Sequence, residues 1–128
     1  MSDLPSEITV EVMTRYIAER SKPDDDRYAF AYTITIRNEG PLAVQLLRRH
    51  WLISSHNGRI QEVMGEGVVG EQPWLNPGQS FSYTSWAMIE TQTGEMSGKY
   101  YFTTEQGEGF WAEVPAFFFI KPEKRVLH

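Results

Sequence analysis

The strongest constraint on the fold is a strict alternation of side-chain size over residues 28–36. Bulky apolar side chains hold every second position and small or hydroxylated ones lie between them: Tyr28, Phe30, Tyr32, Ile34 and Ile36 against Ala29, Ala31, Thr33 and Thr35. Successive side chains of a β-strand point to opposite sides, so this period of two predicts a strand with one buried side. A helix of the same residues would scatter the bulky side chains around its axis, because its period is 3.6.

Weaker versions of this alternation recur between clusters of glycine, proline and asparagine. Asn57 and Gly58 predict a type I′ hairpin turn, and Pro77 and Gly78 after Asn76 predict a type II turn. No ten-residue segment has a convincing helical period. The sequence therefore predicts an all-β, two-sheet antiparallel β-sandwich, immunoglobulin-like or fibronectin type III-like, with about seven to eight strands. Further strands are expected over residues 7–16, 43–55, 59–64, 81–87, 96–104 and 110–120.

The length of 128 residues and a hydrophobic content of 41% suit one core. We expect a single β-sandwich domain over residues 7–120, a flexible N-terminus over 1–6 and a loose C-terminal tail over 121–128. The longest apolar run, residues 114–120, is too short to cross a bilayer, and we expect it to be a buried strand. Since the chain does not start with a basic segment followed by an apolar one, we expect a cytoplasmic protein without membrane insertion.

The net charge of −5 provides no positive field for nucleic acid, which we exclude as a partner. The chain has no cysteine, so it has no thiolate nucleophile. His50, His56 and His128 lack the spacing of metal ligands, and the acidic run 24–26 is expected to be solvated. Neither a nucleophile elbow nor a phosphate-binding P-loop occurs. We therefore expect no enzymatic activity, no metal site and no cofactor.

Gly65, Gly67 and Gly70 match the G-x-G-x-x-G pattern of dinucleotide-binding loops. That pattern binds pyrophosphate only where a helix begins, and Pro73 and Pro77 follow too closely for a helix of useful length. Two interpretations remain open. The loop amides form a nest for an anion, or the glycines serve only a sharp turn between strands.

Residues 48–51 form the one cationic cluster, and with the glycines they give a candidate pyrophosphate site of Gly65, Gly67, Gly70, Arg49 and His50. Alternation places Arg49 on the same side as Trp51, which we expect in the core. Arg49 therefore points inward unless a bulge intervenes, and it then needs a carboxylate or several carbonyls as partners.

Seventeen aromatic side chains are more than one small core can easily bury. Trp74, Trp86, Tyr100, Tyr101, Phe110 and Trp111 lie near turns or on both parities of their strands, so several of them are expected at the surface, where clustered aromatics mark a partner surface. The alternative is that a loop of the chain or a second copy covers them. The candidate partner surface consists of Trp74, Trp86, Tyr101 and Trp111.

Several of these motifs together resemble the bacterial ApaG family, also called CorD. The resemblance is carried by residues 49–51, 57–58, 65–73, 77–78, 81–85 and 96–100 and extends over about residues 7–120. It implies a fibronectin type III-like sandwich, a role in protein interactions, and a link to cobalt tolerance and magnesium efflux. It implies no catalytic residues. Trp86, where the family usually has glycine, and residues 91–93, where it usually has proline, depart from the pattern.

Two functions follow from this reading. The first is a non-catalytic ApaG-type module that binds an unidentified protein through an aromatic sheet face or the loop 65–78. The second is a sensor that binds a nucleotide polyphosphate or pyrophosphate, with or without a divalent cation, through the glycine-rich loop.

Overall fold

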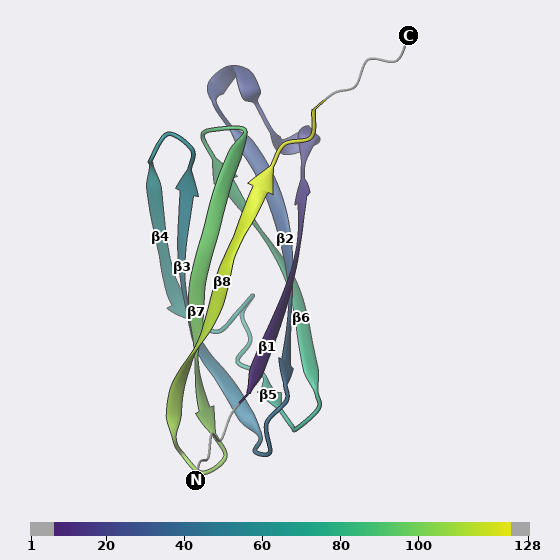
Figure 1. Cartoon of the computed structure of the whole chain (residues 1–128), viewed down its shortest axis with the longest axis vertical. Coiled ribbons are helices and arrows are strands. Elements are labelled where there is room, and N and C mark those ends of the chain that lie inside the picture. Colours follow the sequence, from purple (N-terminus) through teal and green to yellow (C-terminus); the bar gives the residue numbers. More distant parts are fainter. Residues whose placement is uncertain (1–6, 124–128) are drawn as a thin grey trace.

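The computed structural model describes residues 7–123, which fold into an elongated two-layer β-sandwich (Figure 1). The expected N-terminal segment 1–6 and residues 124–128 of the expected tail 121–128 lie outside the described residues. Two short 3₁₀ helices, η1 (Ala18–Arg20) and η2 (Pro23–Asp25), link the first two strands. The strands are β1 (Ile8–Tyr16), β2 (Tyr28–Asn38), β3 (Val44–Ser55), β4 (Ile60–Glu66), β5 (Trp74–Leu75), β6 (Ser80–Ile89), β7 (Thr93–Thr104) and β8 (Gly109–Ile120).

The eight strands of the described residues form two antiparallel sheets, which confirms the predicted fold class. One sheet has the order β1-β2-β6, and the other has the order β4-β3-β7-β8 with β5 paired to the start of β3. This arrangement of three strands facing four is that of fibronectin type III domains. The short β5 was not expected from the sequence. Among the described residues, 7–123, no helix is long and apolar enough to span a membrane.

The core between the sheets is largely aromatic, as expected from the alternation in β2. Trp51 is buried at its centre and contacts Tyr100 with ring centroids 5.5 Å apart and Tyr32 at 6.1 Å. The hydroxyl groups of Tyr83 and Tyr100, one from each sheet, are hydrogen-bonded to each other across the core. Burial raises the pKa of both phenols well above the ordinary value, so both hydroxyls stay neutral.

Two bulges allow both halves of the long strands to face this core. In β3 the register shifts between Leu46 and Arg48, so Leu46 and Trp51 are both buried although their positions differ in parity. In β8 the shift lies at Pro115, and Val114 and Phe119 are both buried for the same reason. Each extra residue reverses the alternation, which a strand without a bulge cannot do.

The turn at Asn57 and Gly58 is not the predicted type I′ turn. Only Gly58 has a positive φ, 91°, and its N–H donates to the carbonyl of Ser55 over 3.0 Å. Since Ser55 N–H also donates to the Arg59 carbonyl, the hairpin has a three-residue loop that ends in a glycine bulge. The predicted type II turn is confirmed, because Gly78 has a φ of 86° and Gln79 N–H bonds Asn76 O.

The apolar run 114–120 is a strand, but it is buried on one side only. Phe119 is fully buried, whereas Phe118 and Ile120 are exposed on the other side of the sheet. The expectation of a buried strand therefore holds for one side only, because the outer side of the sheet faces solvent. Beyond it, Lys121, the first residue of the expected tail, donates its N–H to the carbonyl of Gln92.

Candidate functional site

The most distinctive surface is the outer face, which we define as the side of the β4-β3-β7-β8 sheet turned away from the other sheet. Arg48, Tyr101 and Trp111 lie side by side there, because Arg48 pairs with Tyr101 and Tyr101 with Trp111 across β3, β7 and β8. The two rings are 5.0 Å apart between centroids. The Arg48 guanidinium lies 5.4 Å from the Tyr101 ring, and the Lys99 ammonium 4.7 Å from the Trp111 ring. Both cations are thus held on aromatic surfaces by cation–π contacts.

Most of the exposed large apolar side chains lie on this outer face, where charged residues such as Glu62, Lys99 and Glu113 stand between them. Of the eleven large apolar side chains that are exposed in the described chain, seven lie there, three lie on the outside of the β1-β2-β6 sheet, and one is in a loop. Of the seven, the sequence predicted only the two tryptophans, Trp74 and Trp111, as surface residues. The other five occupy positions that alternate with the inward-facing residues of their strands, and this alternation is the signal that could have identified them. The seven are Leu52, Ile60, Met64, Trp74, Trp111, Phe118 and Ile120.

Three of the four predicted partner-surface residues lie on this face. Trp74 pairs with Gln45, which pairs with Thr103, so Trp74 occupies the row next to Tyr101 and Trp111. Trp86 does not belong to the group, because it lies on β6 in the other sheet, with the Arg20 guanidinium 4.4 Å from its ring. Strand parity alone cannot tell which sheet a residue belongs to, which is why the sequence grouped the four.

Arg49 points to the inner side with Trp51, as the alternation predicted, and it is paired with carbonyls. Its Nη1 atom donates to the Gly67 carbonyl over 2.8 Å and to the Glu66 carbonyl over 3.1 Å. Gly65 lies directly opposite Arg49 in the β3–β4 pair. A Cβ atom at Gly65 would be 2.8 Å from both terminal guanidinium nitrogens, so this glycine provides the space that the guanidinium fills.

The other two glycines form a tight turn. Residues 68–71 close a two-residue hairpin in which Val68 and Glu71 exchange both backbone hydrogen bonds, and the central residues Val69 and Gly70 have φ values of 41° and 82°. These values define a type I′ turn. Position 67 requires glycine, because its φ is 66° and a Cβ atom there would collide with the Glu71 carbonyl of the turn.

Most of the backbone N–H groups that could bind an anion in this loop already donate hydrogen bonds within the protein. The N–H of Gly67 donates to the Leu47 carbonyl, and those of Val68 and Glu71 donate to each other's carbonyls. Within the turn, the N–H groups of Val69 and Gly70 are left to meet a ligand. The geometry thus accounts for all three glycines of the G-x-G-x-x-G pattern through packing and turn formation.

His50 does not join Arg49, because neighbouring residues of a strand point to opposite sides. Its Nε2 atom lies 2.6 Å from Oε2 of Glu62 on the outer face. The structure therefore brings together Arg49, Gly65 and Gly67 of the candidate anion site and leaves His50 on the other side of the sheet.

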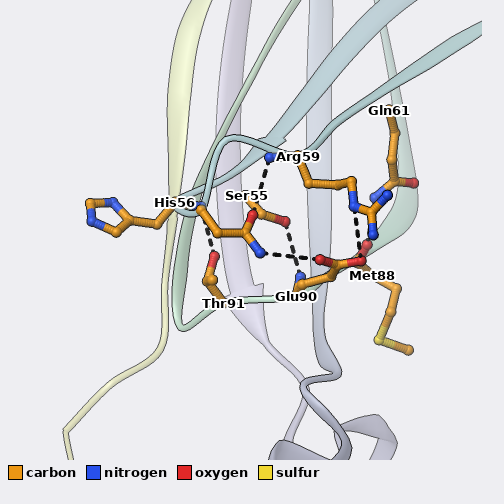
Figure 2. A network of polar contacts seen from close by, with 8 residues as sticks. Ser55, His56, Arg59, Gln61, Met88, Glu90 and Thr91 are labelled. Carbon is orange, nitrogen blue, oxygen red and sulfur yellow. Dashed lines mark hydrogen bonds and ion pairs between the residues drawn. The ribbon is translucent and has the colours of Figure 1, made fainter.

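A polar network fastens the end of the β3–β4 hairpin to the connection between β6 and β7 (Figure 2). The Glu90 carboxylate lies 3.4 Å from Arg59 Nε and accepts a hydrogen bond from Asn57 Nδ2, and Glu90 N–H donates to Ser55 Oγ. Gln61 Nε2 donates to the Met88 carbonyl over 2.8 Å. The edge strand β4 is held to the other sheet by these contacts. The His56 imidazole points away from the network (Figure 2).

Other features of the surface are less pronounced. A shallow hollow of about 400 Å³ lies between Ser54, His56, Glu95, Phe118 and Ile120. Over residues 7–123, no three His, Cys, Asp or Glu side chains gather as they would around a metal ion.

The sheet order and the aromatic core place the molecule in the class of fibronectin type III-like β-sandwiches. Residues 18–104 match the model of the ApaG domain. The chain is 53% identical to Protein ApaG of Ralstonia nicotianae over 95% of this chain and 97% of that one, and 50% identical to Protein ApaG of an Azoarcus species over 94% of both. The crystal structure of a Bordetella pertussis protein given the name ApaA matches with a TM-score of 0.90 at 42% identity, over 94% and 98% of the two chains. The chain therefore belongs to the ApaG domain family.

Proposed function

We propose that this chain is a non-catalytic, cytoplasmic binding module whose outer face docks a protein partner. The observation that carries the proposal is that most of the exposed large apolar side chains lie on one side of one sheet. Protein interaction sites mix apolar and polar side chains, and tryptophan, tyrosine and arginine are the residue types that dominate their binding energy. Trp111, Tyr101 and Arg48 supply all three types in one row.

This row is also preorganised. Arg48 and Lys99 lie over the rings of Tyr101 and Trp111, so their long side chains lose less rotamer freedom when a partner covers them. The resemblance to proteins linked to cobalt tolerance and magnesium efflux fits this proposal if the effect on divalent cations is exerted through the docked partner.

The alternative function, a sensor of nucleotide polyphosphate or pyrophosphate, stays a prediction. On the geometry above it would depend on the N–H groups of Val69 and Gly70 and on the guanidinium nitrogens of Arg49 that do not bond the loop. Protein docking is favoured because the outer face offers a far larger recognition surface than these groups.

The test compares the two outer sides of the sandwich with matched variants. A photo-crosslinking amino acid at Leu52, on the outer face, should trap a partner in cells, whereas the same group at Met88, on the opposite sheet and equally exposed at 41%, should not. The trapped protein is identified by mass spectrometry and purified, and its affinity is measured by calorimetry.

Trp111→Ala should weaken that affinity by about 2 kcal/mol, or roughly 30-fold, as expected for a tryptophan that contributes strongly to an interface. Trp86→Ala is the control, because Trp86 has similar exposure on the other sheet, 50% against 45%. Equal trapping at Leu52 and Met88, or equal effects of the two tryptophan substitutions, would refute the outer face as the docking surface.

A further inference from the structure

The outer edge of β4 is a second candidate binding surface, because its outward backbone N–H and C=O groups pair with no other strand of the described residues. The four-stranded path of the larger sheet is wider than the three-stranded sheet, and β6 packs across β3, one strand in from β4. β4 therefore extends beyond the sheet opposite, at the side of the sandwich in Figure 1, and none of its residues is buried.

The backbone groups that face outward can be assigned from the two ends of the β3–β4 pair. Ser55 N–H donates to the Arg59 carbonyl at one end and Gly67 N–H donates to the Leu47 carbonyl at the other. In an antiparallel pair, residues of the same parity bond the partner strand and those between them point away. Ile60, Glu62 and Met64 thus direct both N–H and C=O to the free edge.

This edge lacks several of the features that usually block strand addition. Natural edge strands are protected by proline, charged side chains, bulges or a covering element, and of these β4 has only charged side chains, two glutamates. β8 contains Pro115 at a bulge, and it lies against β1. On β6, the carbonyl of Met88 is occupied by Gln61. The residues of β4 include no proline, lysine or arginine, and its register with β3 has no shift. The network around Glu90 also holds β4 in place, which lowers the entropy lost when another strand pairs with it.

The side chains along this edge define the charge of the strand that fits. Glu62 and Glu66 are its charged residues, and they alternate with Ile60 and Met64 on the outer face. One carboxylate oxygen of Glu62, Oε2, is bonded to His50 Nε2, so its Oε1 is the atom that meets an added strand. A second copy of the chain would bring two such pairs of carboxylates together on proteins that each carry a net charge of −5, which disfavours self-pairing. A basic segment has the complementary charge.

We propose that the free edge of β4 binds an extended, lysine- or arginine-bearing segment of another protein by strand addition. The segment bonds the outward N–H and C=O groups of Ile60, Glu62 and Met64 and places its basic side chains beside Glu62 and Glu66. The site ends where Arg49 Nη1 occupies the Glu66 carbonyl. This site is separate from the outer-face row around Trp111, so each can fail without the other.

The test is an amide NMR titration of the whole chain with a synthetic peptide of alternating lysine and valine, matched in length to β4. Saturable shifts should centre on residues 60–66. A peptide of alternating glutamate and valine, and a lysine–valine peptide N-methylated at alternate residues, should each bind at least about tenfold more weakly, because the first reverses the charge and the second removes the edge donors.

Met64→Pro supplies the matched protein variant. Proline at 64 removes an outward N–H and leaves the β3 ladder intact, so the variant should fold and bind the peptide at least about tenfold more weakly. Met64→Ala keeps the N–H and should bind within about threefold of the parent. If Met64→Pro does not fold, the N-methylated peptide alone decides.

The proposal is overturned if millimolar lysine–valine peptide leaves the β4 amides unshifted, or if N-methylation has no effect. It is also overturned if these amides shift with protein concentration alone, which would mean that a second copy occupies the edge. Trp111→Ala should leave peptide binding unchanged, and loss of binding in that variant would show that the peptide reads the outer face instead.

Discussion

Gly65→Ala tests whether the first glycine of the motif serves Arg49 rather than a ligand. The new Cβ atom would lie 2.8 Å from both terminal nitrogens of the guanidinium, which must move away. Arg49 then loses its bonds to the Glu66 and Gly67 carbonyls, 3.1 and 2.8 Å long. At about 1 to 1.5 kcal/mol each for half-exposed bonds from a charged donor, this loss is about 2 to 3 kcal/mol.

A compensating gain comes from the backbone. Gly65 lies in a strand and has no positive φ, so alanine fits its conformation and restricts the unfolded chain, which stabilises the protein by about 0.5 to 1 kcal/mol. Gly65→Ala should therefore lower the free energy of unfolding by about 2 kcal/mol in the parent. In an Arg49→Ala background the clash is absent, and the same substitution should raise it by about 0.5 kcal/mol.

Urea unfolding followed by tryptophan fluorescence measures all four corners of this double-mutant cycle. The expected coupling between the two sites is more than about 2 kcal/mol, well above the error of the method. If Gly65→Ala destabilises both backgrounds equally, the steric explanation of this glycine is refuted, and a role in ligand binding regains support.

Three further predictions address the core, the turn and the alternative function. The buried pair of Tyr83 and Tyr100 has raised pKa values, so only the unfolded chain ionises them above the ordinary value of 10.0, and stability should fall above that pH by about 1.4 kcal/mol per pH unit for each phenol. Tyr83→Phe together with Tyr100→Phe should reduce that slope in alkaline urea titrations and leave the part due to Tyr32, whose pKa burial also raises, whereas a slope unchanged in the double variant would contradict the assignment. Val69→Gly should stabilise the protein by about 1 kcal/mol in thermal unfolding, because a β-branched residue is strained at a φ of 41°; a loss of stability would show that the turn carries no strain. Pyrophosphate, ATP and diadenosine tetraphosphate, with and without Mg²⁺ or Co²⁺, should leave the amides of residues 65–70 unshifted at millimolar concentration in NMR titrations; saturable shifts that Arg49→Ala abolishes would establish the sensor instead.

The sequence by itself determined most of the strands and, away from the two bulges, their buried sides. The alternation in residues 28–36 and around Trp51 fixes which side chains face the core, because the period of a strand is a local property of the backbone. The type II turn at Pro77 and Gly78 is local in the same way, since proline sets one φ and glycine allows the next to be positive. The inward direction of Arg49 followed from the same alternation.

Only the tertiary structure decided which of these residues meet. Trp74, Tyr101 and Trp111 share a face, and Trp86 does not, because the pairing of strands far apart in the chain assigns each to a sheet. The sequence alone could not show that Gly65 lies against Arg49, because that contact depends on the β3–β4 register. The free edge of β4 depends on the unequal widths of the two sheets. Periodicity fixes the side of a strand that a residue occupies, whereas its neighbours depend on register and sheet order, which are long-range properties.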